Sequence, residues 1–176
     1  LFVVLIAFSL SLPIEDFIEE SFPGCNTSSH MFSGYLNVEQ GRKELHYILV
    51  ESEDKWNKDP LLIWFNGGPG CSSMLGMFQE NGPCVVDDDS TVFFDNPHSW
   101  SKRLNVLFIE APAGVGYSYA RDRTDKQYND FTSSSDTLKA LNHFFIKFPE
   151  FVGRDLYLSG ESYAGIYVPY LAWRIH

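Results

Sequence analysis

The stretch DLYLSGESYAGIYVP, residues 155–169, contains a Gly-x-Ser-x-Gly pattern between a short apolar run and a helix-like segment. A serine on such a turn occupies a strained backbone, and its hydroxyl projects from the edge of a sheet. Gly160 and Gly165 would remove side chains where strand and helix crowd together. The following helix would aim its N-terminal amides at the hydroxyl, where negative charge develops during acyl transfer. The segment therefore predicts Ser162 as the nucleophile of a serine hydrolase.

Short apolar runs predict the strands around this turn. Residues 61–65, 106–109 and 156–158 are continuously apolar, as in strands covered on both faces. Ahead of the last run, residues recur at three- and four-residue steps along one face of a predicted helix, which stops at Pro149. These residues are Phe131, Ser135, Leu138, Leu141, Phe145 and Phe148. Strand, helix and strand in this order predict a right-handed parallel crossover.

An antiparallel hairpin is predicted before these strands. FSGYLNV at 32–38 and ELHYILVES at 44–52 alternate in part, and the gap between them contains Gly41. A hairpin joined to parallel strands makes a mixed sheet. We therefore expect an α/β fold, with a mixed, mostly parallel sheet flanked by helices.

Composition restricts the class of protein. The 176 residues are 44% hydrophobic and 20% charged, which fits one globular domain or part of a larger one. The net charge is −10 and no Lys/Arg cluster is present, so nucleic acid is not an expected partner. Three cysteines, Cys25, Cys71 and Cys84, match no zinc spacing and leave an odd thiol. We expect neither a metal nor a cofactor.

The N-terminal run LFVVLIAFSLSL, residues 1–12, is apolar and uncharged. It is too short for a membrane-spanning helix, which needs about 20 residues, but it has the length of a signal-peptide core. We therefore assign 1–20 to a partial signal peptide or pro-region, and 21–176 to the N-terminal part of a single domain. A buried first strand or helix is the alternative. Asn26 begins an Asn-Thr-Ser sequon and becomes a glycosylation candidate if the protein is secreted.

A glycine-rich turn follows the first buried strand in WFNGGPGCSS, residues 64–73. Such a turn lets backbone N–H groups approach a substrate oxygen and could supply part of an oxyanion hole. A tight turn without a ligand is the alternative. A phosphate loop is excluded because no Gly-Lys-Ser/Thr follows. Gly114-Val-Gly116 lacks the third glycine of a dinucleotide loop, and we expect it to border the active cleft.

Four motifs in order resemble the serine carboxypeptidase family: WFNGGPGCSS, NPHSW at 96–100, VLFIEAPAGVGYSY at 106–119, and LSGESYAGIYVP at 158–169. The resemblance covers most of 31–175. It implies the α/β-hydrolase fold and a secretory-pathway enzyme, in a lysosome or vacuole or outside the cell, with no membrane association after signal removal. The implied substrate is a peptide or protein with a free C-terminal carboxylate. Oligomeric state is not implied.

The resemblance also implies site residues. Ser162 would be the nucleophile, with the N–H groups of Gly68 and Tyr163 as the oxyanion hole. The substrate carboxylate would be bound by Trp64, Asn66, Gly67, Glu80 and Glu161. Cys71 would pair with a cysteine outside this sequence.

The acidic pair Glu80 and Glu161 would bind a carboxylate only if protonated. Two close carboxyl groups cannot both ionise cheaply, so one is expected to keep a proton and to donate it in a hydrogen bond. Substrate binding should then weaken as the pH rises above mildly acidic values.

The catalytic triad is incomplete in this sequence. A serine nucleophile needs a base and an acid, which in this fold follow it along the chain. No Asp or Glu follows Ser162, and His176 is the last residue. His143 lies in the predicted helix, where we expect it on the polar flank. We therefore expect a piece of a protein more than twice as long, inactive and poorly stable by itself.

Two other functions are compatible with the motifs. Acyltransferase relatives use the same triad, but they tend to carry Asp at the position of Glu161 and Ser at that of Ala164, so this sequence favours the peptidase. An inactive binding homologue or truncated product is the second alternative. The presence of the missing Asp and His would distinguish an enzyme from it.

Overall fold

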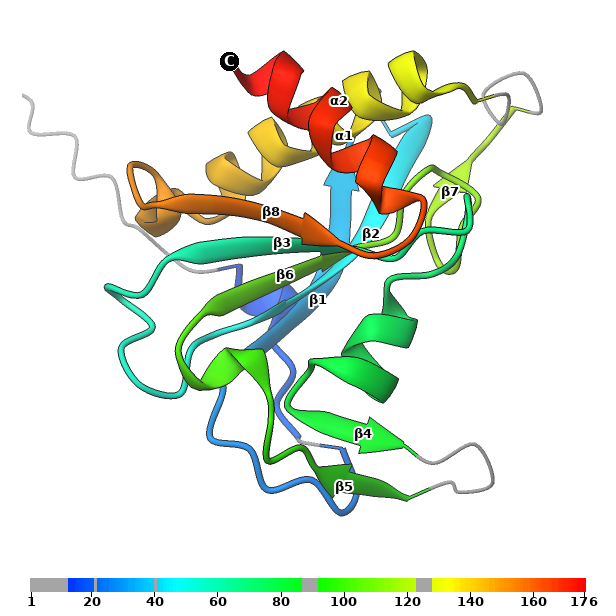
Figure 1. Ribbon diagram of the computed structural model, residues 1–176. Coiled ribbons are helices and arrows are strands. Elements are labelled where there is room, and N and C mark those ends of the chain that lie inside the picture. The colour runs from blue at the N-terminus through cyan, green and yellow to red at the C-terminus, as the bar shows by residue number, and fades with distance from the viewer. Residues whose placement is uncertain (1–12, 21, 40, 87–91, 123–127) are drawn as a thin grey trace, which may run out of the picture.

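The computed structural model describes residues 13–20, 22–39, 41–86, 92–122 and 128–176. Its centre is a mixed sheet (Figure 1). The strands lie in the order β1 (Met31–Asn37), β2 (Lys43–Val50), β6 (Asn105–Ile109), β3 (Leu61–Phe65) and β8 (Leu156–Gly160), and β7 (Tyr119–Ala120) also pairs with β2. β2 runs antiparallel to both of its neighbours, β1 and β6, whereas β3 runs parallel to β6 and β8. The predicted hairpin, parallel crossover and mixed sheet are confirmed.

Two helices, α1 (Asp130–Lys147) and α2 (Ala164–Ile175), pack together on one face of the sheet (Figure 1). The other face is covered by a π-helical turn, and a two-stranded hairpin packs on that turn (Figure 1). These smaller elements are η2 (Gly76–Glu80), β4 (Cys84–Val86) and β5 (Phe93–Asp95). Single turns of 3-10 helix in the described residues are η1 (Ile14–Asp16), η3 (Trp100–Lys102) and η5 (Pro149–Phe151). Among the described residues, no helix is long and apolar enough to cross a bilayer.

The sheet separates two apolar clusters. On the helical side, residues such as Phe32, Leu49 and Phe144 form the larger cluster, and Ile48, Phe108 and Met77 belong to the one beneath. All five residues of β3 and of β6 are buried, as predicted. The prediction that β8 is covered on both faces is wrong, because Tyr157 is 53% exposed. β8 is the last strand of the described sheet and has β3 on one side only.

Helix α1 forms where the sequence predicts it, but its buried face differs. Asn129 caps it, accepting from the Thr132 N–H at 2.9 Å, and it ends before Pro149. Phe131, on the predicted apolar face, is 55% exposed. The buried residues are Ser133, Ser134, Asp136, Thr137, Ala140, Leu141 and Phe144.

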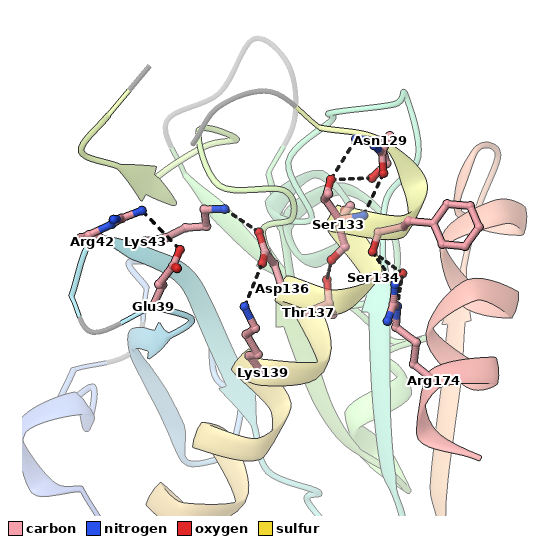
Figure 2. A network of polar contacts seen from close by, with 12 residues as sticks. Glu39, Arg42, Lys43, Asn129, Ser133, Ser134, Asp136, Thr137, Lys139 and Arg174 are labelled. Carbon is pink, nitrogen blue, oxygen red and sulfur yellow. Dashed lines mark hydrogen bonds and ion pairs between the residues drawn. The ribbon is translucent and has the colours of Figure 1, made fainter. Parts of the chain in front are cut away.

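Partners on neighbouring elements explain why these polar side chains are buried (Figure 2). Asp136 forms an ion pair with Lys43 of β2, and Ser134 Oγ accepts from Arg174 Nε of α2 at 2.7 Å. Buried polar groups are stable when they are hydrogen-bonded. The helix therefore turns Asp136 toward β2 and Ser134 toward α2, and not toward solvent.

Cys25 and Cys84 form a disulfide, with 5.8 Å between their Cα atoms. It ties the segment before β1 to β4. Cys71 is a free, exposed cysteine, in agreement with the expectation that it has no partner within this sequence.

Part of the segment assigned to the signal or pro-region packs on the domain. Asp16 accepts a hydrogen bond from the Tyr47 hydroxyl at 2.5 Å and pairs with Lys147 of α1. Phe17 forms a bridge with Phe32 of β1. Residues 1–12 lie outside the described residues, and the assignment of 1–20 stays a prediction.

Candidate active site

Ser162 lies on a strained turn between β8 and α2. Its φ is 55°, and it is the one non-glycine residue with positive φ in the described part of the chain. Such a conformation is uncommon for a residue with a side chain and is held here by the strand and helix on either side. The residue is exposed at the end of the sheet.

The glycines of the motif differ in their roles. A Cβ at Gly160 would lie 2.4 Å from the Phe65 carbonyl oxygen and 2.6 Å from Ala164 Cβ, so the predicted crowding is confirmed there. A Cβ at Gly165 would meet no heavy atom within 4 Å. The prediction for Gly165 is therefore wrong, because this residue is on the exposed side of α2, away from the described strands.

The glycine-rich loop after β3 touches the Ser162 turn directly. A Cβ at Gly67 would lie 2.5 Å from the backbone nitrogen of Tyr163 and 2.7 Å from the Glu161 carbonyl oxygen. The loop turns sharply, with the Cys71 N–H donating to the Gly67 carbonyl at 3.1 Å. Within the described residues, neither the Gly68 nor the Tyr163 N–H donates a hydrogen bond. Both amides are thus without a hydrogen-bond acceptor in the described part of the chain.

The predicted carboxylate-binding residues converge on one buried amide. Asn66 is 2% exposed, and its Nδ2 donates to Glu80 Oε1 at 3.1 Å and to Glu161 Oε1 at 3.0 Å. Its Oδ1 accepts from Trp64 Nε1 at 2.8 Å and from the Gly76 N–H at 3.0 Å. Asn66 therefore fixes both glutamates, which are exposed at the surface beside Ser162.

Gly76 is a residue that sequence reasoning missed. A Cβ there would lie 2.2 Å from Trp64 Nε1, so a side chain would displace the indole that orients Asn66. The glycine precedes Glu80 by one π-helical turn, and no motif marked it.

A second missed residue is Glu110, which is fully buried just beyond β6. Its carboxylate accepts from the Tyr117 N–H at 2.7 Å, contacts His46 Nδ1 at 3.0 Å, and accepts from the Ser72 hydroxyl. Burial acts to raise the pKa of Glu110, but these hydrogen bonds outweigh it and hold that pKa below its ordinary value. The Gly114-x-Gly116 pattern was the available signal, because a Cβ at Gly116 would overlap this carboxylate.

A cavity of about 330 Å³ lies between the Ser162 turn and the start of α1. Its walls include Pro69, Pro112, Tyr163 and Tyr167. The Tyr163 hydroxyl donates to Asp130 Oδ1 at 3.3 Å. The cavity is large enough for an amino-acid side chain.

No described histidine contacts Ser162. His143 Nδ1 accepts from the Asn37 N–H at 3.1 Å and so joins α1 to β1. Burial lowers the pKa of His143. His30 contacts Glu51 at 3.1 Å, and His46 contacts Glu110. No group of three or more described His, Cys, Asp or Glu residues could hold a metal ion.

Asn26 is exposed, as a glycosylation acceptor must be. Its side-chain Nδ2 donates to Asp95 Oδ2 at 3.3 Å and its N–H to Oδ1 at 2.6 Å. Glycosylation at Asn26 stays a prediction.

A family model described as Peptidase_S10, serine carboxypeptidase, matches residues 23–176. The chain belongs to the serine carboxypeptidase family. Among curated members, it is 48% identical over 145 residues to serine carboxypeptidase ctsa-3.1 of Caenorhabditis elegans, covering 80% of this chain and 25% of the relative. It is 45% identical over 147 residues to the lysosomal protective protein of Mus musculus, covering 82% of this chain and 30% of the relative.

The serine carboxypeptidase fold is also shared with a solved structure. Kex1Δp, a prohormone-processing carboxypeptidase from Saccharomyces cerevisiae, superposes with a TM-score of 0.73 at 30% identity, over 88% of this chain and 36% of that one. The likeness confirms the predicted α/β-hydrolase fold. The chain spans between 25% and 37% of the length of curated relatives that it matches.

Proposed function

We propose that the complete protein is a serine-type carboxypeptidase that releases C-terminal residues from peptides through an acyl-enzyme. The observation that carries this proposal is the position of Ser162, at φ 55° on a turn against which Gly67 packs. Gly67 lies against the turn that carries the exposed Ser162, and neither the Gly68 nor the Tyr163 N–H donates a hydrogen bond within the described residues. That arrangement is suited to attack on a carbonyl group.

In the proposed reaction, the Ser162 hydroxyl attacks the carbonyl carbon of the last peptide bond. A general base supplied from outside these residues takes the hydroxyl proton and passes it to the leaving amine. The Gly68 and Tyr163 N–H groups donate to the oxyanion, and loss of such a donor typically costs about 3–4 kcal/mol of transition-state stabilisation. Water then hydrolyses the acyl ester on Ser162.

The Asn66 network supports cleavage at the chain end. Because Asn66 uses both Nδ2 hydrogens on Glu80 and Glu161, it holds the two carboxyl groups next to the nucleophile. A protonated glutamate can donate to the substrate carboxylate, whereas an ionised one repels it. Trp64 fixes Asn66, and the Gly67 N–H would add a donor.

The same site defines the partner and the compartment that we propose. The partner is a peptide or protein with a free C-terminal carboxylate. The Cys25–Cys84 disulfide is typical of an oxidising compartment, which supports a location in the secretory pathway, in a lysosome or vacuole or outside the cell.

The test is Ser162→Ala in the complete protein, with Ser159→Ala of β8 as the matched serine control. We expect Ser162→Ala to abolish both release of terminal amino acids and labelling by a fluorophosphonate probe, and Ser159→Ala to retain them. Peptides with an amidated C-terminus should be poor substrates. Undiminished release by Ser162→Ala would refute the proposal.

A further inference from the structure

We propose that Glu110 is a positioning residue, which holds the loop carrying Gly68 against the Ser162 turn by means of Ser72; this presupposes the proposed hydrolase chemistry. Glu110 directly follows β6 in the chain. This strand lies between β2 and β3 in the sheet (Figure 1). Its side chain does not reach Ser162. It contacts groups from three segments that surround the end of the sheet.

The buried carboxylate has a partner on each of these segments. His46 belongs to β2, Ser72 to the loop after β3, and the Tyr117 N–H to the loop after β6. A buried charge is stable only when it is fully hydrogen-bonded, and removing one partner is costly. Glu110 therefore resists displacement of any one segment relative to the other two.

Two consecutive hydroxyls fix the loop after β3 to the end of β6. Ser72 donates to the Glu110 carboxylate, and Ser73 Oγ donates to the Ile109 carbonyl at 2.6 Å while it accepts from the Asn66 N–H at 3.3 Å. Gly68 lies between Asn66 and Ser72 in the chain. One end of the turn that contains Gly68 is thus bonded to the end of β6, and the other end is bonded to Ser73.

The cluster of Ser33, His46 and Glu110 could alternatively be interpreted as a second hydrolytic site. Ser33 Oγ lies 3.0 Å from His46 Nε2, and His46 Nδ1 lies 3.0 Å from Glu110, as in a Ser-His-acid triad. Ser33, however, is in the middle of strand β1, without the strained turn that exposes Ser162. The other carboxylate contacts go to Ser72 and Tyr117, which favours the positioning role.

The role predicts a particular kinetic effect. A shift of Gly68 weakens a contact made to the oxyanion, which exists only in the transition state, so kcat should fall and KM should change little. Complete loss of one oxyanion donor lowers kcat by about 100- to 1,000-fold. For a displaced donor we expect a fall of about 10- to 100-fold.

The experiment compares Ser72→Ala with Ser118→Ala in the complete protein. Ser118 Oγ donates to the Glu110 backbone carbonyl at 2.6 Å but has no contact with the glycine-rich loop. Both variants therefore delete a hydroxyl bound to the same residue. We expect Ser72→Ala to lower kcat at constant KM and Ser72→Thr to restore most of it. Ser118→Ala should retain kcat, whatever its effect on the melting temperature.

A second measurement is independent of peptide substrates. The rate at which a fluorophosphonate modifies Ser162 depends on the same N–H groups, and it should fall in Ser72→Ala but not in Ser118→Ala. Failure of the wild-type protein to release terminal residues would refute the carboxypeptidase proposal alone. Unchanged kcat and labelling rate in Ser72→Ala, or equal losses in both variants, would refute the role of Glu110.

Discussion

Lys43 of β2 and Asp136 of α1 form a buried ion pair, with 2.8 Å between Nζ and Oδ2 (Figure 2). The same carboxylate has an exposed second cation, Lys139, whose Nζ lies 3.8 Å from Oδ1. Lys43 therefore contacts the Asp136 carboxylate from the protein interior, and Lys139 contacts it from the surface. Their substitution separates the effect of burial from the effect of charge.

We expect Lys43→Met to lower the free energy of unfolding by about 3–5 kcal/mol, because it leaves Asp136 buried with only a surface partner. Lys139→Met removes the same charge at the surface and should cost no more than about 1 kcal/mol. Denaturant unfolding of both variants of the complete protein at one pH measures the difference. Equal losses would contradict the importance of burial.

Substitution of Gly67 should damage the site more than the fold. A Cβ atom would lie 2.5 Å from the Tyr163 nitrogen, so Gly67→Ala must separate the loop from the Ser162 turn. We expect kcat/KM to fall by at least about 100-fold, the size of the effect of one lost oxyanion donor. Far-ultraviolet circular dichroism should stay that of the wild type. A fully active Gly67→Ala protein would disprove the contact.

Asn66→Asp tests the carboxylate-binding network at nearly constant shape. The variant keeps an oxygen for Trp64 and Gly76, but it replaces the two Nδ2 donors by a third acid beside Glu80 and Glu161. Like charges disfavour a further carboxylate, so KM should rise by about 10-fold or more, and the rise should be larger at about pH 7 than at about pH 4. Steady-state kinetics on one peptide across this pH range provide the test. A KM equal to that of the wild type would exclude Asn66 from substrate binding.

Glu51 should make the fold less stable as the pH rises. Burial raises the pKa of Glu51, although a hydrogen bond from His30 opposes the shift. Because the folded state keeps this proton above about pH 4.5 while the unfolded state loses it, the stabilisation is complete at lower pH and disappears as the pH rises through the raised pKa. Glu51→Gln should flatten the melting temperature between about pH 4 and 7, and Glu39→Gln, at an exposed glutamate, should not. Identical profiles for Glu51→Gln and the wild type would contradict this.

Sequence pattern was sufficient where structure depends on local composition. The apolar runs of β3 and β6 predict strands buried on both faces, and Pro149 marks the end of α1. The exposure of β8 and the buried face of α1 were not predictable in this way. They depend on which strand lies next to β8 and on Lys43 and Arg174, which are distant from α1 in the chain.

The same distinction between local and distant determinants applies to the candidate site. Motif residues such as Ser162, Asn66 and Glu161 were predicted together, and the structure brings them together through Asn66. Glu110 and Gly76 were missed, because their partners come from other loops and a lone acid or glycine has no characteristic spacing. Only the fold shows what these two residues contact.

The open side of β8 has a practical consequence. Within the described residues this strand presents an unpaired row of backbone donors and acceptors, next to the exposed ring of Tyr157. A bare strand edge of this kind is a template for pairing with another copy. We therefore expect bacterial expression of residues 13–176 alone to yield inclusion bodies.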